Sequence, residues 1–304
     1  MSRTAPDVAV AIEDPRDLAE PGLLTDLMTL TKARLSLLVI ITTFVGFCMA
    51  SDSGLDWLQL FHAIGGTTLA AAAAGVLNQR IETNVDRLME RTRNRPLPAG
   101  RMKPATALIL GVALGTAGVA WLWLTTNTMA ASLALATIVT YIAFYTPLKR
   151  RTSLCTIVGA VSGAIPPVIG WTAVHPSFDL GAWVLFGILF TWQMPHFLAI
   201  AWMYRDEYAQ AGFVMILRDD ISGAATAMQS LLYTLALLII TTIPFFAGQN
   251  NSVYLVFALL LDCVMLVFAL RFLFERSRPT ARLLFFTSIF YLPLILGLMI
   301  FTKS

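Results

Sequence analysis

The stretch NQRIETNVDRLMERTRNR, residues 78–95, is the densest polar segment of a very apolar chain, and it directly follows an alanine-rich run that is long enough to cross a bilayer. Oxygen-bearing side chains recur in it every four residues, at Asn78, Glu82 and Asp86. If the helix continues past the membrane face, all three project from one side of it. Such a row of oxygen ligands, backed by arginines, suits hard divalent cations and a phosphate-rich ligand. We therefore predict a metal and anion site at this end of the helix.

Outside this segment the composition is that of a membrane protein. Of the 304 residues, 57% are hydrophobic and 13% are charged, whereas a soluble domain carries about 25% charged residues. The apolar residues come in runs of roughly 20, the length that spans the hydrocarbon layer. We expect an all-α integral membrane domain over residues 29–304, preceded by a polar, disordered cytoplasmic tail over residues 1–28. The nine predicted membrane-spanning helices cover residues 35–50, 57–77, 105–124, 129–147, 153–172, 180–203, 223–247, 252–272 and 282–301.

The distribution of basic residues predicts the orientation of these helices. With the N-terminus in the cytoplasm, 20 of the 21 Lys and Arg residues fall on the cytoplasmic side, and only Lys303 lies outside. Cytoplasmic loops of multi-pass proteins are enriched in Lys and Arg, so the asymmetry favours this orientation. The first 25 residues are polar and mixed in charge, unlike a cleavable signal peptide. The same bias explains the net charge of +3, and we expect no nucleic acid partner.

A second polar loop, YRDEYAQAGFVMILRDD at residues 204–220, follows the sixth span. It supplies carboxylates at Asp206 and Glu207, whereas Asp219 and Asp220 are expected to be solvated surface residues. Two acidic clusters that face one cavity would form a negative pocket, which binds a diphosphate only through bridging cations. Mg²⁺ is the expected cation, because it is usually shared between carboxylates and phosphates.

Two kinds of residue inside the spans have no predicted catalytic role. Cys48, Cys155 and Cys263 all fall in apolar spans without metal-ligand spacing, and we expect them to be small core residues. Asp262 lies in the middle of the eighth span, where a carboxylate is costly. It must therefore have a polar partner or a water pocket, and we assign it no task.

The pattern N-x3-E-x3-D-x2-M-x-R-T-x2-R-P at residues 78–96 resembles the signature of the protohaem IX farnesyltransferases, or haem O synthases. These enzymes belong to the UbiA superfamily of intramembrane prenyltransferases. Three further segments are similar and follow in the right order, so the resemblance covers most of residues 30–215. They are LTKARLSLLVIITTFVGF at 30–47, YTPLKRRTSLCTIVGAVSGAIPPVIGW at 145–171 and WQMPHFLAIAWMYRDEYAQAGFVM at 192–215.

The resemblance implies nine transmembrane helices around a central cavity that opens near the cytoplasmic face of a bacterial inner membrane and sideways to lipid. It implies transfer of the farnesyl group of farnesyl diphosphate to a vinyl group of haem b, giving haem O and diphosphate, with Mg²⁺ as the cofactor. It also implies that the product passes on to haem A synthase or to terminal oxidase assembly.

The resemblance also assigns roles to individual residues. By matching position, Asn78, Glu82 and Asp86 would form the first metal–diphosphate motif. The second motif would comprise Asp206, Glu207 and Tyr208, and phosphate would be bound by Lys149 and Arg150. Superfamily members commonly carry Asp at the position of Glu82, and their second motif often reads Asp-Tyr where this chain has Asp-Glu-Tyr. The departures leave open which carboxylate of the second motif binds the metal.

The chemistry of prenyl transfer suggests further candidates. Cleavage of an allylic C–O bond leaves a diphosphate and an allyl cation, so cationic side chains should stabilise the departing charge. We expect Arg91 and Arg95 to join the phosphate-binding cations, although contact with lipid headgroups is an alternative role for them. Aromatic rings offer negative faces to the allyl cation, and interfacial anchoring is their alternative role. The aromatic candidates are Trp192, Phe197, Tyr141 and Tyr145.

His196 is the histidine with the clearest candidate role. It lies within the sixth span, in the sequence PHF, and an intramembrane ionisable residue is a functional candidate by default. Its imidazole could ligate the haem iron and so orient the macrocycle. A neutral, hydrogen-bonded histidine packed against another helix is the alternative.

Two other functions compete with this hypothesis. A different UbiA-type enzyme would prenylate a quinone precursor or a chlorophyllide, and the R-T-x2-R-P run together with PHF argues against it. A secondary transporter would use the polar loops as an ion pathway. Transporters place their binding groups near mid-membrane on broken helices, whereas the polar groups here cluster at one face.

Overall fold

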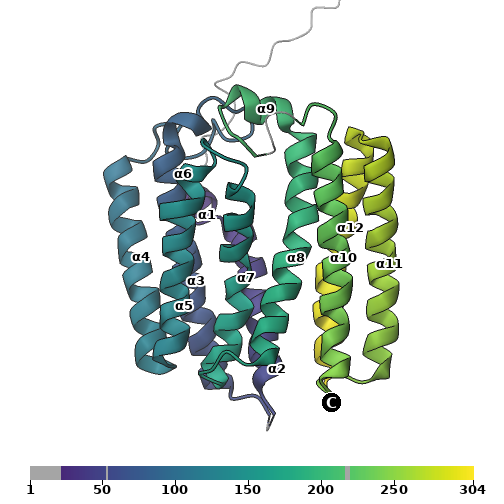
Figure 1. Cartoon of the computed structure of the whole chain (residues 1–304). Helices are drawn as coiled ribbons and strands as arrows, with labels where there is room; N and C mark the ends of the chain where they lie inside the picture. The colour runs from purple at the N-terminus through teal and green to yellow at the C-terminus, as the bar shows by residue number, and fades with distance from the viewer. Residues whose placement is uncertain (1–21, 53, 216–219) are drawn as a thin grey trace, which may run out of the picture.

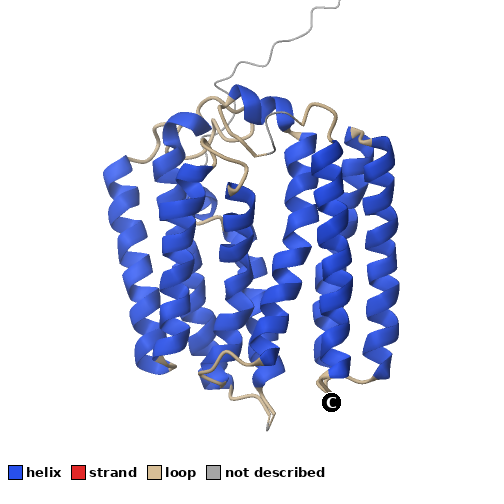
Figure 2. Cartoon of the chain, in the orientation of Figure 1, coloured by secondary structure: helices blue, strands red, loops and turns tan. Residues whose placement is uncertain are grey.

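The chain folds into a bundle of long helices that run roughly side by side (Figures 1 and 2). The computed structural model describes residues 22–52, 54–215 and 220–304. The helices in these ranges are α1 (Leu23–Leu30), α2 (Ala33–Ala50), α3 (Trp57–Asp86), α4 (Pro104–Thr125), α5 (Thr128–Val139), the π-helix η1 (Thr140–Tyr145), α6 (Thr146–Leu148), α7 (Cys155–Val174), α8 (Leu180–Met203), α9 (Arg205–Gln210), α10 (Ala224–Phe246), α11 (Ser252–Glu275) and α12 (Arg278–Phe301).

The lengths and composition of the helices agree with a membrane-spanning bundle. Within the described ranges, eight helices are long and apolar enough to cross a membrane. Helices α1 and α2 form a pair bent by 54°, and the number of spans reaches nine if this pair is one span. The predicted all-α membrane fold is therefore confirmed, whereas the number nine depends on the bent pair. Helix α1 begins at Leu23, inside the range that we assigned to the tail; residues 1–21 lie outside the described residues.

Helix α3 carries the polar segment beyond the membrane. It has 30 residues, which corresponds to a length of about 45 Å, whereas the hydrocarbon layer is about 30 Å thick. Its start is fixed by Asp56, whose carboxylate accepts hydrogen bonds from the backbone N–H groups of Leu58 and Gln59. The last turns of α3, from Asn78 to Asp86, therefore extend to the membrane face as one continuous helix.

Helices α2 and α7 approach each other closely in the middle of the bundle. A Cβ atom at Gly46 would lie 1.8 Å from the carbonyl oxygen of Pro167, and one at Gly170 would lie 2.0 Å from that of Thr43. Any larger residue at either position would force the two backbones apart. These two glycines thus position α2 against α7, the helices that form two walls of the cavity described below.

The two polar loops lie at the same end of the bundle. Val85 and Met89 at the end of α3 pack against Tyr208, Ala211 and Phe213, which follow α8. In Figure 1 the short helices α6 and α9 lie at this end, and the C-terminus lies at the opposite end. The distribution of basic residues predicted that the two polar loops lie on the same side of the membrane, and their position at one end of the bundle confirms this.

Candidate functional site

The predicted row of oxygen ligands lies on one buried side of the last turns of α3. Asn78, Glu82 and Asp86 are 0%, 6% and 1% exposed. Charged groups are seldom buried so completely unless they are paired. The burial therefore argues against a solvated surface role for the two carboxylates.

Each of the three side chains is held by a different cation. Lys32 Nζ donates to Asn78 Oδ1 over 2.6 Å. The ammonium of Lys149 lies 2.8 Å from Glu82 Oε1, and the guanidinium of Arg95 lies 2.8 Å from Asp86 Oδ2. The three cations come from different parts of the chain: the break between α1 and α2, the loop after α6 and the loop after α3. The sequence prediction brought Lys149 and Arg95 to this site but did not include Lys32.

The backbone conformation of Lys32 explains how it reaches the site. Lys32 separates α1 from α2 and has a left-handed backbone with φ of 53°, which is uncommon for a residue other than glycine. Gln79 of α3 supports the break, because its side-chain amide donates to the carbonyl oxygens of Thr29 and Leu30. One sign of this arrangement is visible in the sequence, namely a lysine inside an otherwise apolar segment. The positive-inside rule accounts for that lysine by membrane orientation alone, so it does not point to a binding site.

Lys149 lies in a mostly aromatic and acidic environment. Its ammonium lies 4.6 Å from the ring centre of Tyr145 and 5.6 Å from that of Phe213, within the range of cation–π attraction. Burial opposes the charge, but Tyr145 and Glu82 outweigh it and raise the pKa of Lys149 above its ordinary value. These neighbours therefore favour the charged form of Lys149 at this end of the bundle.

The π-helix η1 places two tyrosines beside these cations. Tyr141 and Tyr145 have ring centres 4.9 Å apart, and the hydroxyl of Tyr141 lies 3.3 Å from Lys32 Nζ. Thr146, directly after η1, accepts a hydrogen bond of 3.1 Å from the amide of Asn78. Single π-helical turns are rare and occur frequently at functional sites. Here the turn joins α5 to the polar end of α3.

An apolar cavity of about 320 Å³ begins at this polar cluster and extends into the bundle. Lys32 and Tyr141 belong both to its wall and to the cluster. Small residues of α3 such as Ala70 and Ala74 line one part. Aromatic and polar side chains of α8 line another, namely Trp192, Gln193, His196 and Phe197. The four predicted aromatic candidates, Tyr141, Tyr145, Trp192 and Phe197, all line this one cavity.

His196 lies on the cavity wall, where α8 meets α12. Its Nδ1 lies 2.8 Å from Ser288 Oγ, and its ring packs against those of Trp192 and Phe285, at centre distances of 5.1 and 4.9 Å. The histidine is thus hydrogen-bonded and packed, as the alternative interpretation required. It also faces the cavity, as the haem hypothesis required.

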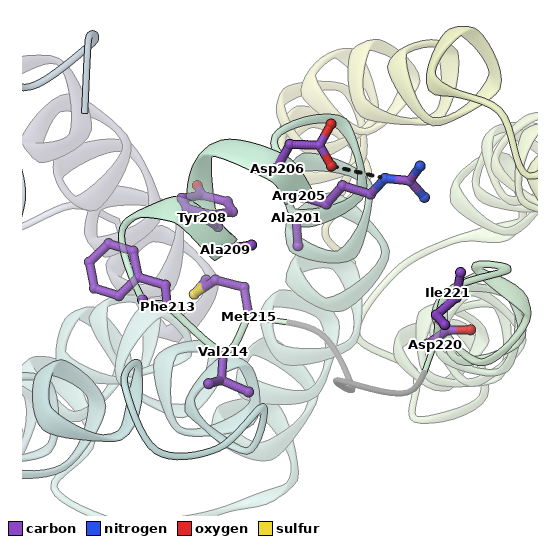
Figure 3. A pocket seen from close by; sticks show the side chains of 11 residues that line it. Ala201, Arg205, Asp206, Tyr208, Ala209, Phe213, Val214, Met215, Asp220 and Ile221 are labelled. Atoms are coloured by element: carbon purple, nitrogen blue, oxygen red, sulfur yellow. Dashed lines mark ion pairs between the residues drawn. The ribbon is translucent and has the colours of Figure 1, made fainter. Parts of the chain in front are cut away.

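The second acidic motif lies at the rim of the bundle (Figure 3). Asp206 is exposed and forms ion pairs with Arg278 of α12 and Arg205. Tyr208 is buried, and its hydroxyl accepts a hydrogen bond of 3.2 Å from Arg91. A pocket of about 530 Å³ lies here, lined by Tyr208, Asp206 and Phe213 among others. Arg91 and Tyr208 thus connect the two motifs, while Asp206 points to α12.

The remaining loop residues have separate positions. Arg150 is exposed, unlike its neighbour Lys149, and Glu207 is half-buried beside Tyr208. Asp220 caps the start of α10, because its carboxylate accepts hydrogen bonds from the backbone N–H groups of Ala225 and Thr226. The expectation that Asp220 is solvated is therefore wrong. Asp219 lies outside the described residues.

The donor atoms of the first motif fit a divalent ion that is shared with a ligand. Within the described residues, no three Asp, Glu, His or Cys side chains lie close enough together to hold a metal ion alone. Mg²⁺ is usually bound by one or two carboxylates plus substrate phosphates rather than by a cage of protein ligands. The two buried carboxylates and the amide oxygen of Asn78, which is bound to the cavity-lining Lys32, match that requirement.

The buried groups without a predicted role are also accounted for. Asp262 accepts hydrogen bonds from Thr241, at 2.6 Å, and from Tyr291, which confirms the expected polar partners. Cys48 and Cys155 are buried as expected, whereas Cys263 is exposed on α11, so its assignment to the core is wrong.

Comparison with known proteins agrees with this architecture. Residues 39–292 match the UbiA prenyltransferase family. A protein of Solibacter usitatus named Protoheme IX farnesyltransferase is 42% identical over 287 residues, covering 91% of this chain and 98% of its own. The human mitochondrial protein of that name is 38% identical over 283 residues, covering 93% of this chain and 62% of its own.

Solved structures share the fold at low sequence identity. A structure of digeranylgeranylglyceryl phosphate synthase superimposes with a TM-score of 0.79 at 16% identity, covering 92% of this chain and 98% of that one. A UbiA homologue from Archaeoglobus fulgidus bound to GPP and Mg²⁺ superimposes with a TM-score of 0.64 at 12% identity, covering 90% and 99%. The matched family covers most of the helical bundle, and this chain belongs to the UbiA prenyltransferase family.

Proposed function

We propose that the chain transfers the farnesyl group of farnesyl diphosphate to a vinyl group of haem b, with Mg²⁺ as the cofactor, and releases haem O and diphosphate. The observation that carries the proposal is the junction between the charged cluster and the apolar cavity, where Lys32 and Tyr141 belong to both. A prenyl diphosphate has the same division into a charged head and an apolar tail. The name shared by the relatives supports haem as the acceptor.

The charged cluster is the proposed binding site of the diphosphate. Asn78, Glu82 and Asp86 are the residues that would hold Mg²⁺, with Asp206 or Glu207 contributing from the second motif. Bound Mg²⁺ would supply Lewis-acid neutralisation of the phosphate oxygens. Lys32, Lys149 and Arg95 are then released from their present carboxylate and amide partners and can donate to the diphosphate instead. The family resemblance also assigns Arg91 and Arg150 to phosphate, and of the two Arg91 is in contact with the buried Tyr208.

The proposed reaction needs a water-poor space beside this cluster. The C–O bond between the farnesyl carbon and the diphosphate breaks, and the electron pair leaves with the diphosphate. The terminal vinyl carbon of haem b attacks the allyl cation. Water then adds to the carbocation that forms on the porphyrin side and releases one proton, which leaves the hydroxyl group. Tyr141 and Tyr145 present ring faces between the cluster and the cavity, where they can stabilise the allyl cation. The apolar walls of α3 and α7 keep water from the cation before the vinyl group attacks.

The other end of the cavity is the proposed haem site. His196 would ligate the iron, while Trp192 and Phe197 would pack on the macrocycle. A quinone precursor has no metal for a histidine on the cavity wall to ligate, and the name shared by the relatives favours haem over a chlorophyllide. The transporter alternative requires a polar pathway through the bundle, whereas the cavity is lined mainly by apolar side chains.

The experiment that tests the proposed donor chemistry is release of diphosphate by the purified protein in lipid nanodiscs. We expect release only when farnesyl diphosphate, haem b and Mg²⁺ are all present. A chelator should abolish the release, and added Mg²⁺ should restore it. The reason is that the two buried carboxylates repel a trianionic diphosphate unless a cation lies between them. Equal release in excess chelator would contradict the metal requirement.

We further propose that the protein lies in the bacterial inner membrane with both polar loops in the cytoplasm, as the basic residues indicate. In a background without native cysteines, Glu90→Cys and Gln210→Cys are exposed positions in the two loops, and Ser177→Cys lies in a loop at the opposite end. An impermeant maleimide added to spheroplasts should label only the variant at residue 177. Labelling of residue 90 or 210 before lysis would show that the orientation is reversed.

A further inference from the structure

One serine of α12 makes three hydrogen bonds around the histidine on the cavity wall. Ser288 is fully buried, and its Oγ lies 2.8 Å from His196 Nδ1. The same Oγ donates to the backbone carbonyl oxygen of Phe285 over 2.6 Å. The backbone carbonyl of Ser288 accepts a hydrogen bond of 2.7 Å from the indole N–H of Trp192. Two residues of α8, one turn apart, are thus bound to the same residue of α12.

The protons in this network can be counted. A serine hydroxyl has one proton to donate, and a carbonyl oxygen can only accept, so the proton of Ser288 is directed to Phe285. Ser288 Oγ must then accept from His196, which places a proton on Nδ1. A neutral imidazole carries one N–H, and its other nitrogen has a free lone pair. In the neutral histidine that nitrogen is Nε2.

The rest of the environment leaves Nε2 available to the cavity. His196 lines the cavity wall. In the part of the chain that the structure describes, Nε2 has no hydrogen-bond partner. Nε2 is also not fully enclosed by other atoms. The rings of Trp192 and Phe285 pack close to the imidazole, at interplanar angles of 24° and 32°. The ring is therefore held by aromatic packing and by the hydrogen bond at Nδ1, which leaves Nε2 without a partner among the described residues.

We propose that Ser288 is a positioning residue that fixes His196 in the Nδ1–H tautomer, so that Nε2 presents its lone pair to the iron of haem in the cavity. The inference rests on the proposed function, since it takes haem b as the ligand of this part of the cavity. Histidines that bind metals commonly donate their other N–H to a fixed acceptor, which sets the tautomer and the ring orientation. Here the acceptor is a hydroxyl of a different helix.

The tautomer is measured without any haem. The chain contains three histidines, so ¹⁵N-histidine labelling gives three imidazole signals, and His196→Ala identifies the one that belongs to His196. Long-range ¹H–¹⁵N correlation spectra of the protein in nanodiscs should show a protonated Nδ1 and an unprotonated Nε2. In Ser288→Ala the signal should move to the other tautomer or to a mixture. A protonated Nε2 in the wild type, or an unchanged signal in Ser288→Ala, would overturn the proposal.

Haem titration then tests the consequence for the iron. We expect His196→Ala and Ser288→Ala both to change the Soret band and to weaken haem binding, Ser288→Ala by roughly tenfold or more. Farnesyl diphosphate affinity should stay unchanged in both variants, which shows that they are folded. Ser230→Ala is the matched control, because Ser230 is fully buried and its hydroxyl donates to the backbone carbonyl of Thr226 in its own helix. The haem spectrum of this variant should equal that of the wild type.

The outcomes separate this inference from the proposed function. If His196→Ala changes the spectrum and Ser288→Ala does not, the positioning role is wrong and the iron ligand stands. If neither variant changes it, His196 does not bind iron, and the inference fails with it. Formation of haem O by the wild-type protein is measured separately and decides the proposed function.

Discussion

Replacing Asp86 with alanine should lower kcat for farnesyl transfer by on the order of a thousandfold, because the variant loses a metal-binding carboxylate at the point where negative charge develops. Asp86 is 1% exposed and lies 2.8 Å from the guanidinium of Arg95. Its removal takes away one oxygen ligand and leaves Arg95 free to bind the diphosphate without a metal. Substrate binding should therefore suffer less than turnover. The measurement is haem O formation under saturating farnesyl diphosphate.

The loss of a buried ion pair needs its own control in this experiment. Asp26 of α1 forms a comparable pair with Arg101, at 2.7 Å, at the same end of the bundle but outside the cavity wall. Asp26→Ala should retain wild-type activity, and both variants should insert into the membrane at wild-type levels. Wild-type turnover by Asp86→Ala would remove Asp86 from the metal site.

Replacing Lys149 with methionine should lower kcat/KM for farnesyl diphosphate by roughly a hundredfold to a thousandfold, as expected when a preorganised donor to the departing charge is lost. The change removes a largely buried cation and also leaves Glu82 without its partner at 2.8 Å. A buried charged group without a partner is costly, so the metal site should be perturbed as well. Steady-state kinetics at several Mg²⁺ concentrations would show both effects.

Two residues after Lys149, Arg151 provides the matched control. Its side chain is exposed, so Arg151→Met removes a positive charge from the same loop without changing the cluster. Its kinetics should equal those of the wild type. An equal loss in both variants would mean that the loop acts through general membrane-surface charge rather than through Lys149 at the diphosphate.

Much of the fold was predictable because the hydrocarbon layer imposes a length on each helix. The predicted ranges overlap long helices of the described chain, eight of which are long and apolar enough to cross a membrane; 180–203 coincides with α8, whereas 57–77 covers only the first part of α3. The bend between α1 and α2 was missed, because it depends on the left-handed backbone of Lys32 and on the side chain of Gln79. These are contacts between segments that are far apart in the sequence, and periodicity carries no information about them.

The candidate site was predictable where it lies on one helix. The four-residue spacing of Asn78, Glu82 and Asp86 placed them on one side of α3, as the structure has them. The partners of that row come from other helices, so the spacing could not identify Lys32. Ser288 was missed for the same reason: it lies beyond residues 30–215, which carry the family resemblance, and its role depends on contact between α12 and α8.

The reaction proposed for this cavity is the transfer of a farnesyl group to haem b. The most direct measurement offers the purified protein farnesyl diphosphate and Mg²⁺ together with equal amounts of haem b, a quinone precursor and a chlorophyllide, and analyses the products by mass spectrometry. We predict one new product, whose mass equals that of haem b plus a farnesyl group and a hydroxyl, with one diphosphate released per molecule. Prenylation of the quinone precursor or the chlorophyllide, with haem b left unchanged, would show that haem b is not the acceptor.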